Sequence, residues 1–131
     1  MSNKRPLFAL GVILFGLVAC APNAPLSIAA DNAEEIKARP TEKLCIAYYH
    51  LNGGEVVREE LTRRGEVLSK DWPFIDKGQI TVGMSPCAVE AAWGATTLHD
   101  HAGGSLDSYH YTSGYFATFK DGRVVGFIGP P

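Results

Sequence analysis

The chain has 131 residues, which is enough for one domain with a modest core. It carries 12 basic and 14 acidic side chains, so its formal net charge at pH 7 is −2. Nucleic-acid-binding domains concentrate Lys and Arg against phosphate, and this balance gives no such excess. The charge therefore argues against a nucleic-acid partner.

The amino terminus predicts an export signal. Lys4 and Arg5 precede an uncharged apolar run that continues to Cys20. The run at 7–19 is too short to span about 30 Å of hydrocarbon as a helix. The four letters that end it, LVAC, resemble the bacterial lipobox. We therefore expect a lipoprotein signal peptide at 1–19 and lipid on the sulfur of Cys20. The alternative is an ordinary cleaved signal peptide followed by an incidental cysteine.

Lipidation at Cys20 predicts where the protein works. Two or more acyl chains anchor a protein stably to a membrane. Ala21 follows the lipidated cysteine, and by the sorting rule of enteric bacteria this favours the outer membrane. We expect a lipid-anchored protein on the periplasmic face of the outer membrane. Cleavage would leave ten basic and fourteen acidic residues, a net charge of −4.

The remaining cysteines predict a disulfide. With Cys20 lipidated, Cys45 and Cys87 stay in an oxidising compartment, where thiols pair. A bridge across that span stabilises the fold by about 4 kcal/mol in the loop-entropy description. The alternative is a reactive thiol at Cys87, because a helix N-terminus lowers the thiolate pKa. The chain has no CxxC motif, so we predict the bridge.

The first mature segment predicts a linker. Residues 20–40 contain three prolines, many alanines and no aromatic residue, a composition that buries little surface. We expect a flexible, lipid-anchored tether there and a folded domain at 41–131. Its first element, "LCIAYYHL" at 44–51, is apolar and aromatic enough for a strand, with a short helix left open.

Two helical segments are predicted next. Asn52 and Glu55 have the spacing of a helix cap and its partner, and Gly65 ends or kinks that helix. A further helical turn is predicted at 69–77, with Gly78 as its terminator. The aromatic side chains of this turn, at Trp72 and Phe74, are predicted to pack in the core or at a hinge. Exposed together, they would instead mark a partner surface.

The clearest helix signal is "SPCAVEAAWG" at 85–94. Ser85 has a hydroxyl that can cap free backbone N–H groups, and Pro86 suits the first helical position. Gly94 is a natural stop. After it the hydrophobic period changes to that of strands joined by short turns, which forces antiparallel neighbours. The predicted strands are 96–101, 107–112, 115–120 and 123–128.

The sheet is expected to have one core-facing side. The alternation of Tyr109 with Tyr111, and of Tyr115, Ala117 and Phe119, indicates the side chains that face the helices. The Asp-Gly pair between the last two strands is a strong hairpin signal.

The stretch from Ile80 to Val125 resembles the SmpA/OmlA (BamE-like) family of small outer-membrane lipoproteins. The matching elements are "GMS" before the helix, "VEAAWG" at its end, the "YHY" strand and "YFATFKDGRVV". This resemblance implies an α+β fold, with helical segments packed on one face of a three- to four-stranded antiparallel meander. The same architecture occurs in β-lactamase inhibitor proteins.

Histidines suggest one chemical possibility. His99 and His101 share one side of their strand, and the turn at Gly103 and Gly104 can place His99 opposite His110. Three imidazoles on one sheet face can ligate zinc. The alternative is a solvated polar face, and no acidic residue that would support a metal site is evident. We therefore predict no metal and no cofactor.

No catalytic pattern is evident, because the chain has no GxSxG elbow and no phosphate-binding loop. We expect a non-enzyme: an envelope lipoprotein that presents a protein-binding surface, as an accessory to outer-membrane assembly or integrity. Its predicted contacts are the membrane, through Cys20, and an envelope protein, through Trp72, Phe74, Gly103 and Gly104. The alternatives are an inhibitor of a lysozyme, protease or β-lactamase, and a histidine-based metal-binding protein.

Overall fold

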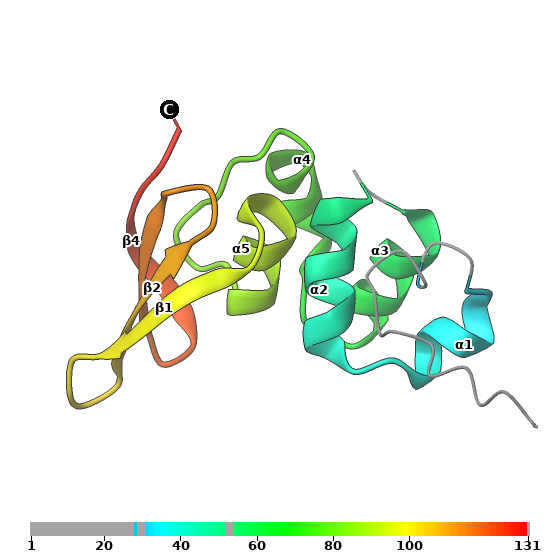
Figure 1. Cartoon of the computed structure of the whole chain (residues 1–131), viewed down its shortest axis with the longest axis horizontal. Coiled ribbons are helices and arrows are strands. Elements are labelled where there is room, and N and C mark those ends of the chain that lie inside the picture. The colour runs from blue at the N-terminus through cyan, green and yellow to red at the C-terminus, as the bar shows by residue number, and fades with distance from the viewer. Residues whose placement is uncertain (1–27, 29–30, 52–53, 131) are drawn as a thin grey trace, which may run out of the picture.

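The computed structural model describes residues 28, 31–51 and 54–130 (Figure 1). The predicted signal peptide and Cys20 lie outside these residues, as does the predicted cap Asn52. The helices are α1 (Ala33–Ala38), α2 (Thr41–His50), α3 (Glu55–Arg63), the 3-10 turn η2 (Ser69–Asp71), α4 (Trp72–Ile75) and α5 (Pro86–Trp93). The strands are β1 (Thr96–His101), β2 (Leu106–Tyr111), β3 (Phe116–Lys120) and β4 (Arg123–Ile128).

The predicted α+β class is confirmed, and its layers are stacked along the long axis of the molecule. Figure 1 shows the sheet at one end, α5 next to it, and the remaining helices behind α5. Helix α2 packs on α5, α3 packs on α2, and α1 contacts α3. The helices therefore cover one face of the sheet, and α5 is the helix that meets it.

The sheet is the predicted meander. Its strand order is β1-β2-β3-β4, and every neighbouring pair is antiparallel. Asp121 and Gly122 form the turn between β3 and β4, with φ angles of 51° and 73°. Two positive φ angles are the signature of the hairpin turn that an Asp-Gly pair favours.

Helix α5 begins and ends where the sequence predicts. The Ser85 hydroxyl accepts the Ala88 N–H at 3.1 Å, and Pro86 occupies the first helical position. Gly94 follows the helix with a φ of 91°. A Cβ atom at residue 94 would lie 2.8 Å from the Thr112 hydroxyl oxygen, so glycine is required here both for its backbone and for space.

Trp93, the last residue of α5, joins the helices to the sheet. Its ring contacts those of Tyr111, Tyr115 and Phe127 at centroid distances of 5.7, 5.0 and 5.9 Å. Its indole N–H donates to the Gly78 carbonyl at 2.9 Å. The side chains predicted to face the helices do so: Tyr111, Ala117 and Phe119 are buried, and Tyr109 and Tyr115 pack against them.

The strand predicted at 44–51 is wrong, and the open alternative, a helix, is correct. Residues 41–50 form α2, which follows Pro40. Its buried side chains, Leu44, Cys45, Ala47 and Tyr48, recur at helical spacing. This face packs on α3 and α5, and a strand would place only alternate residues there.

The expected tether at 20–40 gives way to an ordered helix in its described second half. Asn32 caps α1 by accepting the N–H groups of Glu34 and Glu35, and Ile36 is buried. Arg64 of the segment after α3 donates to the Lys37 and Arg39 carbonyls at 3.0 and 2.9 Å. The folded domain therefore begins before residue 41.

Candidate functional site

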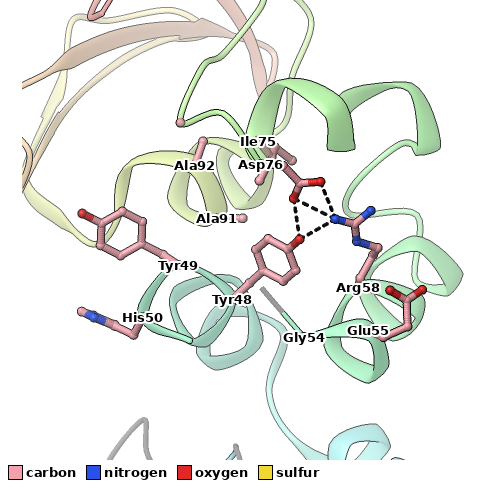
Figure 2. A pocket seen from close by; sticks show the side chains of 11 residues that line it. Tyr48, Tyr49, His50, Gly54, Glu55, Arg58, Ile75, Asp76, Ala91 and Ala92 are labelled. Carbon is pink, nitrogen blue, oxygen red and sulfur yellow. Dashed lines mark hydrogen bonds and ion pairs between the residues drawn. The ribbon is translucent and has the colours of Figure 1, made fainter. Parts of the chain in front are cut away.

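The helical half contains a polar cluster that joins three helices. Tyr48 of α2 donates its hydroxyl to Asp76, which directly follows α4, at 2.7 Å. Arg58 of α3 donates from one nitrogen to both Asp76 oxygens, at 2.7 and 2.6 Å, and to the Tyr48 oxygen at 2.7 Å. Figure 2 shows these three side chains converging at one side of a pocket.

The pocket beside this cluster is half open and has a volume of about 680 Å³. Ala91 and Ala92 of α5 and Ile75 of α4 give it an apolar wall. Tyr49 and His50, at the end of α2, lie on the far side of Tyr48 from Arg58 (Figure 2). The volume lies within the range of small-ligand sites.

The contacts within the cluster stabilise a charged Asp76, a charged Arg58 and a neutral Tyr48. Burial alone would raise the pKa of Asp76, but hydrogen bonds from Tyr48 and Arg58 outweigh it and lower that pKa. Burial raises the pKa of the Tyr48 phenol, and the bond to Asp76 adds to this effect. The Arg58 guanidinium also lies 4.9 Å from the Trp72 ring centroid, a cation–π geometry. The three polar groups satisfy one another, so the cluster first of all holds α2, α3 and α4 together.

The predicted Cys45–Cys87 disulfide is confirmed. The two sulfur atoms are 2.00 Å apart and the Cα atoms 5.3 Å apart. The bridge connects α2 to the first turn of α5, so Cys87 is not available as a reactive thiol. This explains the cysteine in a short helix: it fastens the helix that contacts the sheet to the helix behind it.

The predicted partner contacts do not form one surface. Trp72 is 5% exposed, and its indole N–H donates to the Thr62 hydroxyl. It therefore belongs to the core, and its prediction as a partner contact is wrong. Phe74 on α4 is 40% exposed. Gly103 and Gly104 form the exposed turn after β1, which lies at the tip of the sheet and away from α4 (Figure 1).

The predicted histidine face is wrong, because the β1–β2 register differs by one residue. His99 lies opposite Tyr109, and His110 lies opposite Leu98. The Ala102 N–H donates to the Leu106 carbonyl at 3.1 Å, which leaves a three-residue turn where the prediction assumed four. A shift of one residue moves a side chain to the other face, so His110 is separated from His99 and His101.

The two β1 histidines share an aspartate instead. His99 Nε2 and His101 Nδ1 lie 2.9 and 2.7 Å from the same Asp107 oxygen, and these contacts lower the Asp107 pKa, His101 contributing most. The His99 ring stacks on Tyr109 at 4.3 Å. In the part of the chain that the structure describes, no group of three or more His, Cys, Asp or Glu side chains is arranged to hold a metal ion.

The face of the sheet turned away from α5 carries a feature that sequence reasoning missed. Four side chains lie opposite one another across all four strands and form what we call the outer row: Leu98, His110, Phe116 and Ile128. Leu98 is 52% and Ile128 74% exposed. The His110 and Phe116 rings lie 5.0 Å apart. Strand alternation predicts that His110, Phe116 and Ile128 lie on this face. It does not predict Leu98, because the irregularity between Thr96 and Leu98 interrupts the alternation along β1.

Comparisons of the chain with protein-family models, with curated proteins and with solved structures find no match. The resemblance to the SmpA/OmlA family therefore stays a prediction. Within the described residues, no helix is both long enough and apolar enough to cross a membrane.

Proposed function

We propose that this chain is an envelope lipoprotein, held on the periplasmic face of the outer membrane by lipid on Cys20, that acts by binding a protein partner. In this proposal it is an accessory to outer-membrane assembly or integrity and not an enzyme. The observation that carries the binding role is the outer row, an apolar and aromatic line on the sheet face that α5 does not cover.

The outer row has the properties of a binding surface. Isolated exposed apolar side chains are ordinary on soluble proteins, but contiguous ones gather at interaction sites. Here Leu98 and Ile128, at its two ends, are the most exposed, and the two rings between them are half buried. The next row along the strands is small and polar, and it contains Asp100, Ser108 and Thr118. An apolar centre beside a polar rim is the usual anatomy of a protein interface.

The location is supported by two independent features. The lipobox-like end of the apolar leader predicts acylation of Cys20. The Cys45–Cys87 bridge suits an oxidising compartment. An anchored protein meets its membrane partners at a raised effective concentration, so a modest binding surface is sufficient.

Site-specific photo-crosslinking in the native host tests the binding role. A photoreactive amino acid at Ile128 of the full-length lipoprotein should give a discrete adduct with an envelope protein. The matched position is Glu59, an exposed residue on α3 that is distant from the sheet. The Ile128 adduct should be lost when Leu98→Asp is added, because the charge interrupts the outer row. Equal adducts at both positions, or an adduct indifferent to Leu98→Asp, would contradict the proposal.

A separate experiment tests the anchor. Growth with a labelled fatty acid should label the wild-type protein and leave the Cys20→Ala variant unlabelled, and the labelled protein should fractionate with outer membranes. Label retained by Cys20→Ala would refute lipidation at this residue, and fractionation with inner membranes would refute the location.

A further inference from the structure

Strand β1 is an edge of the sheet, and its hydrogen-bond pattern shows which of its backbone groups point away from β2. In antiparallel pairs, hydrogen-bonded and non-bonded residue pairs alternate. Ala102 and Leu106 form a bonded pair, so Asp100 with Ser108 and Leu98 with His110 are bonded pairs too. The N–H and C=O groups of His99 and His101 therefore point outward from the sheet.

The two edge strands of the sheet, β1 and β4, differ in whether another segment pairs with their outward backbone groups. On the β4 edge, the Gly83 N–H donates to the Val124 carbonyl at 2.8 Å, and the Val124 N–H donates to the Met84 carbonyl at 2.9 Å. The loop before α5 thus pairs with the outward N–H and C=O groups of Val124 on β4. Among the residues that the structure describes, only β2 pairs with the backbone of β1.

The open edge also carries few of the features that usually protect one. Natural edge strands are blunted by proline, lysine or a covering segment. The β1 sequence, TTLHDH, contains neither residue, and five of its six side chains are exposed. Its one irregularity lies between Thr96 and Leu98, so the regular ladder is available from Leu98 to His101.

We propose that β1 accepts an extended segment of the partner as an additional antiparallel strand. This inference rests on the proposed function and names the form of its partner. Outward N–H and C=O groups at strand spacing are complementary to another extended backbone, which is the basis of recognition by strand addition. His99 and His101 would each exchange two hydrogen bonds with the added strand.

The side chains of β1 define the partner's chemistry. Leu98 and Asp100 project from the outer face two residues apart, so a partner strand presents two alternate side chains beside them. An apolar residue next to Leu98 would extend the outer row. Asp100 is exposed and makes no ion pair within the described chain, so a Lys or Arg is favoured beside it. Because the added strand runs antiparallel to β1, the predicted partner motif, read from its N-terminus, is an extended basic-x-apolar segment.

A synthetic peptide tests strand addition directly. The probe is acetyl-Thr-Ile-Thr-Lys-Thr-Ile-Thr-amide, in which Ile and Lys occupy one face and threonines the other. In antiparallel pairing, the residues that bond to His99 and His101 share their face, so the threonine N–H groups face β1. N-methylation of the two central threonines should weaken binding at least about tenfold, because it removes two donors and adds a steric block. N-methylation of both isoleucines should leave affinity within about twofold.

A pair of protein variants tests the corresponding backbone donor on β1, the His101 N–H. His101→Ala removes the imidazole and keeps the backbone N–H, whereas His101→Pro removes both. Because the His101 N–H points away from β2, proline leaves the β1–β2 ladder intact. The peptide should bind His101→Pro at least about fivefold more weakly than His101→Ala. Circular dichroism establishes that both variants are folded, and the methylated peptides test the proposal on wild-type protein in any case.

Three results would overturn the inference: no binding of the unmethylated peptide, binding that survives methylation of the threonines, or equal affinities for His101→Ala and His101→Pro. The proposed function is tested separately, by crosslinking at Ile128. An Ile128-specific adduct without peptide binding would refute strand addition and leave the protein-binding role standing.

Discussion

The helical half and the sheet meet at Trp93, and they use their polar groups in opposite ways. In the helical half, charged side chains bind one another: Arg58 of α3 with Asp76 after α4, and Glu60 of α3 with Arg64 at the end of the same helix. The disulfide adds a covalent link between α2 and α5. The outer face and β1 edge of the sheet present apolar side chains and backbone groups without such partners. The charge pairs and the disulfide are thus concentrated in the helical half, and the surface that we propose for partner binding lies on the sheet.

The strongest test of this division removes the disulfide. Replacing Cys45 and Cys87 together with alanine should lower the free energy of unfolding by about 4 kcal/mol, because the unfolded chain regains the entropy of the closed loop. Urea denaturation measures this loss, and reduction of the wild-type protein is the matched condition. A loss below about 1 kcal/mol in both would contradict the assigned role of the bridge.

The next largest effect is expected at Arg64. Its guanidinium is 16% exposed, binds Glu60 at 2.7 Å and reaches the end of α1, so Arg64→Ala should cost about 2–3 kcal/mol. Faster hydrogen exchange in α1 should accompany the loss. Arg63→Ala is the control, since Arg63 is 63% exposed and binds only Glu60, and it should cost less than about 1 kcal/mol. Equal losses would show that the link to α1 adds nothing.

Acid should weaken the same contact. Hydrogen bonds from Arg63 and then Arg64 lower the pKa of Glu60 from 4.5 to about 2. The folded state therefore binds a proton less readily than the unfolded state, and this stabilisation is present above pH 4.5 and lost as the pH falls toward 2. Denaturation curves between pH 6 and 2 should show a steeper loss for the wild-type protein than for Glu60→Gln. Parallel pH profiles would rule out this contribution.

The smallest effect on stability is expected on the outer row. Ile128→Asp replaces a side chain that is 74% exposed, so the free energy of unfolding should change by about 0.5 kcal/mol or less. The same change should abolish partner crosslinking from a photoreactive residue at Leu98. A substantial loss of stability would mean that Ile128 belongs to the packing of the domain, and the contrast between the two halves would fail there.

Much of the fold could be predicted from local signals. The cap at Ser85 and the stop at Gly94 set the limits of α5, and strand alternation with an Asp-Gly turn set the meander. Helices α1 and α2 were harder, because each depends on distant partners. Ile36 is ordered by burial and by Arg64, and α2 by the contacts of Cys45 and Tyr48. The amino-acid composition of residues 20–40 does not indicate the burial of Ile36 or the contact of α1 with Arg64.

The candidate sites were predicted less well than the fold. One residue of turn length decided whether His99 faced His110, and the residue pattern did not fix that length. The cluster of Tyr48, Arg58 and Asp76 joins residues up to 28 positions apart, so no local motif marks it. The edge role of β1 follows from strand order, which short turns predicted, but the pairing of the β4 edge with Gly83 and Met84 has no sequence signal.

Residue-resolved amide hydrogen exchange on the purified protein tests the central claim most directly. The His99 and His101 amides should exchange at least about a hundredfold faster than those of Leu98 and Asp100, because only the latter pair with β2. The added peptide should slow the His99 and His101 amides and leave α2 unchanged. Equal protection along β1 in the free protein, or no change on adding peptide, would contradict an open edge that receives a partner strand.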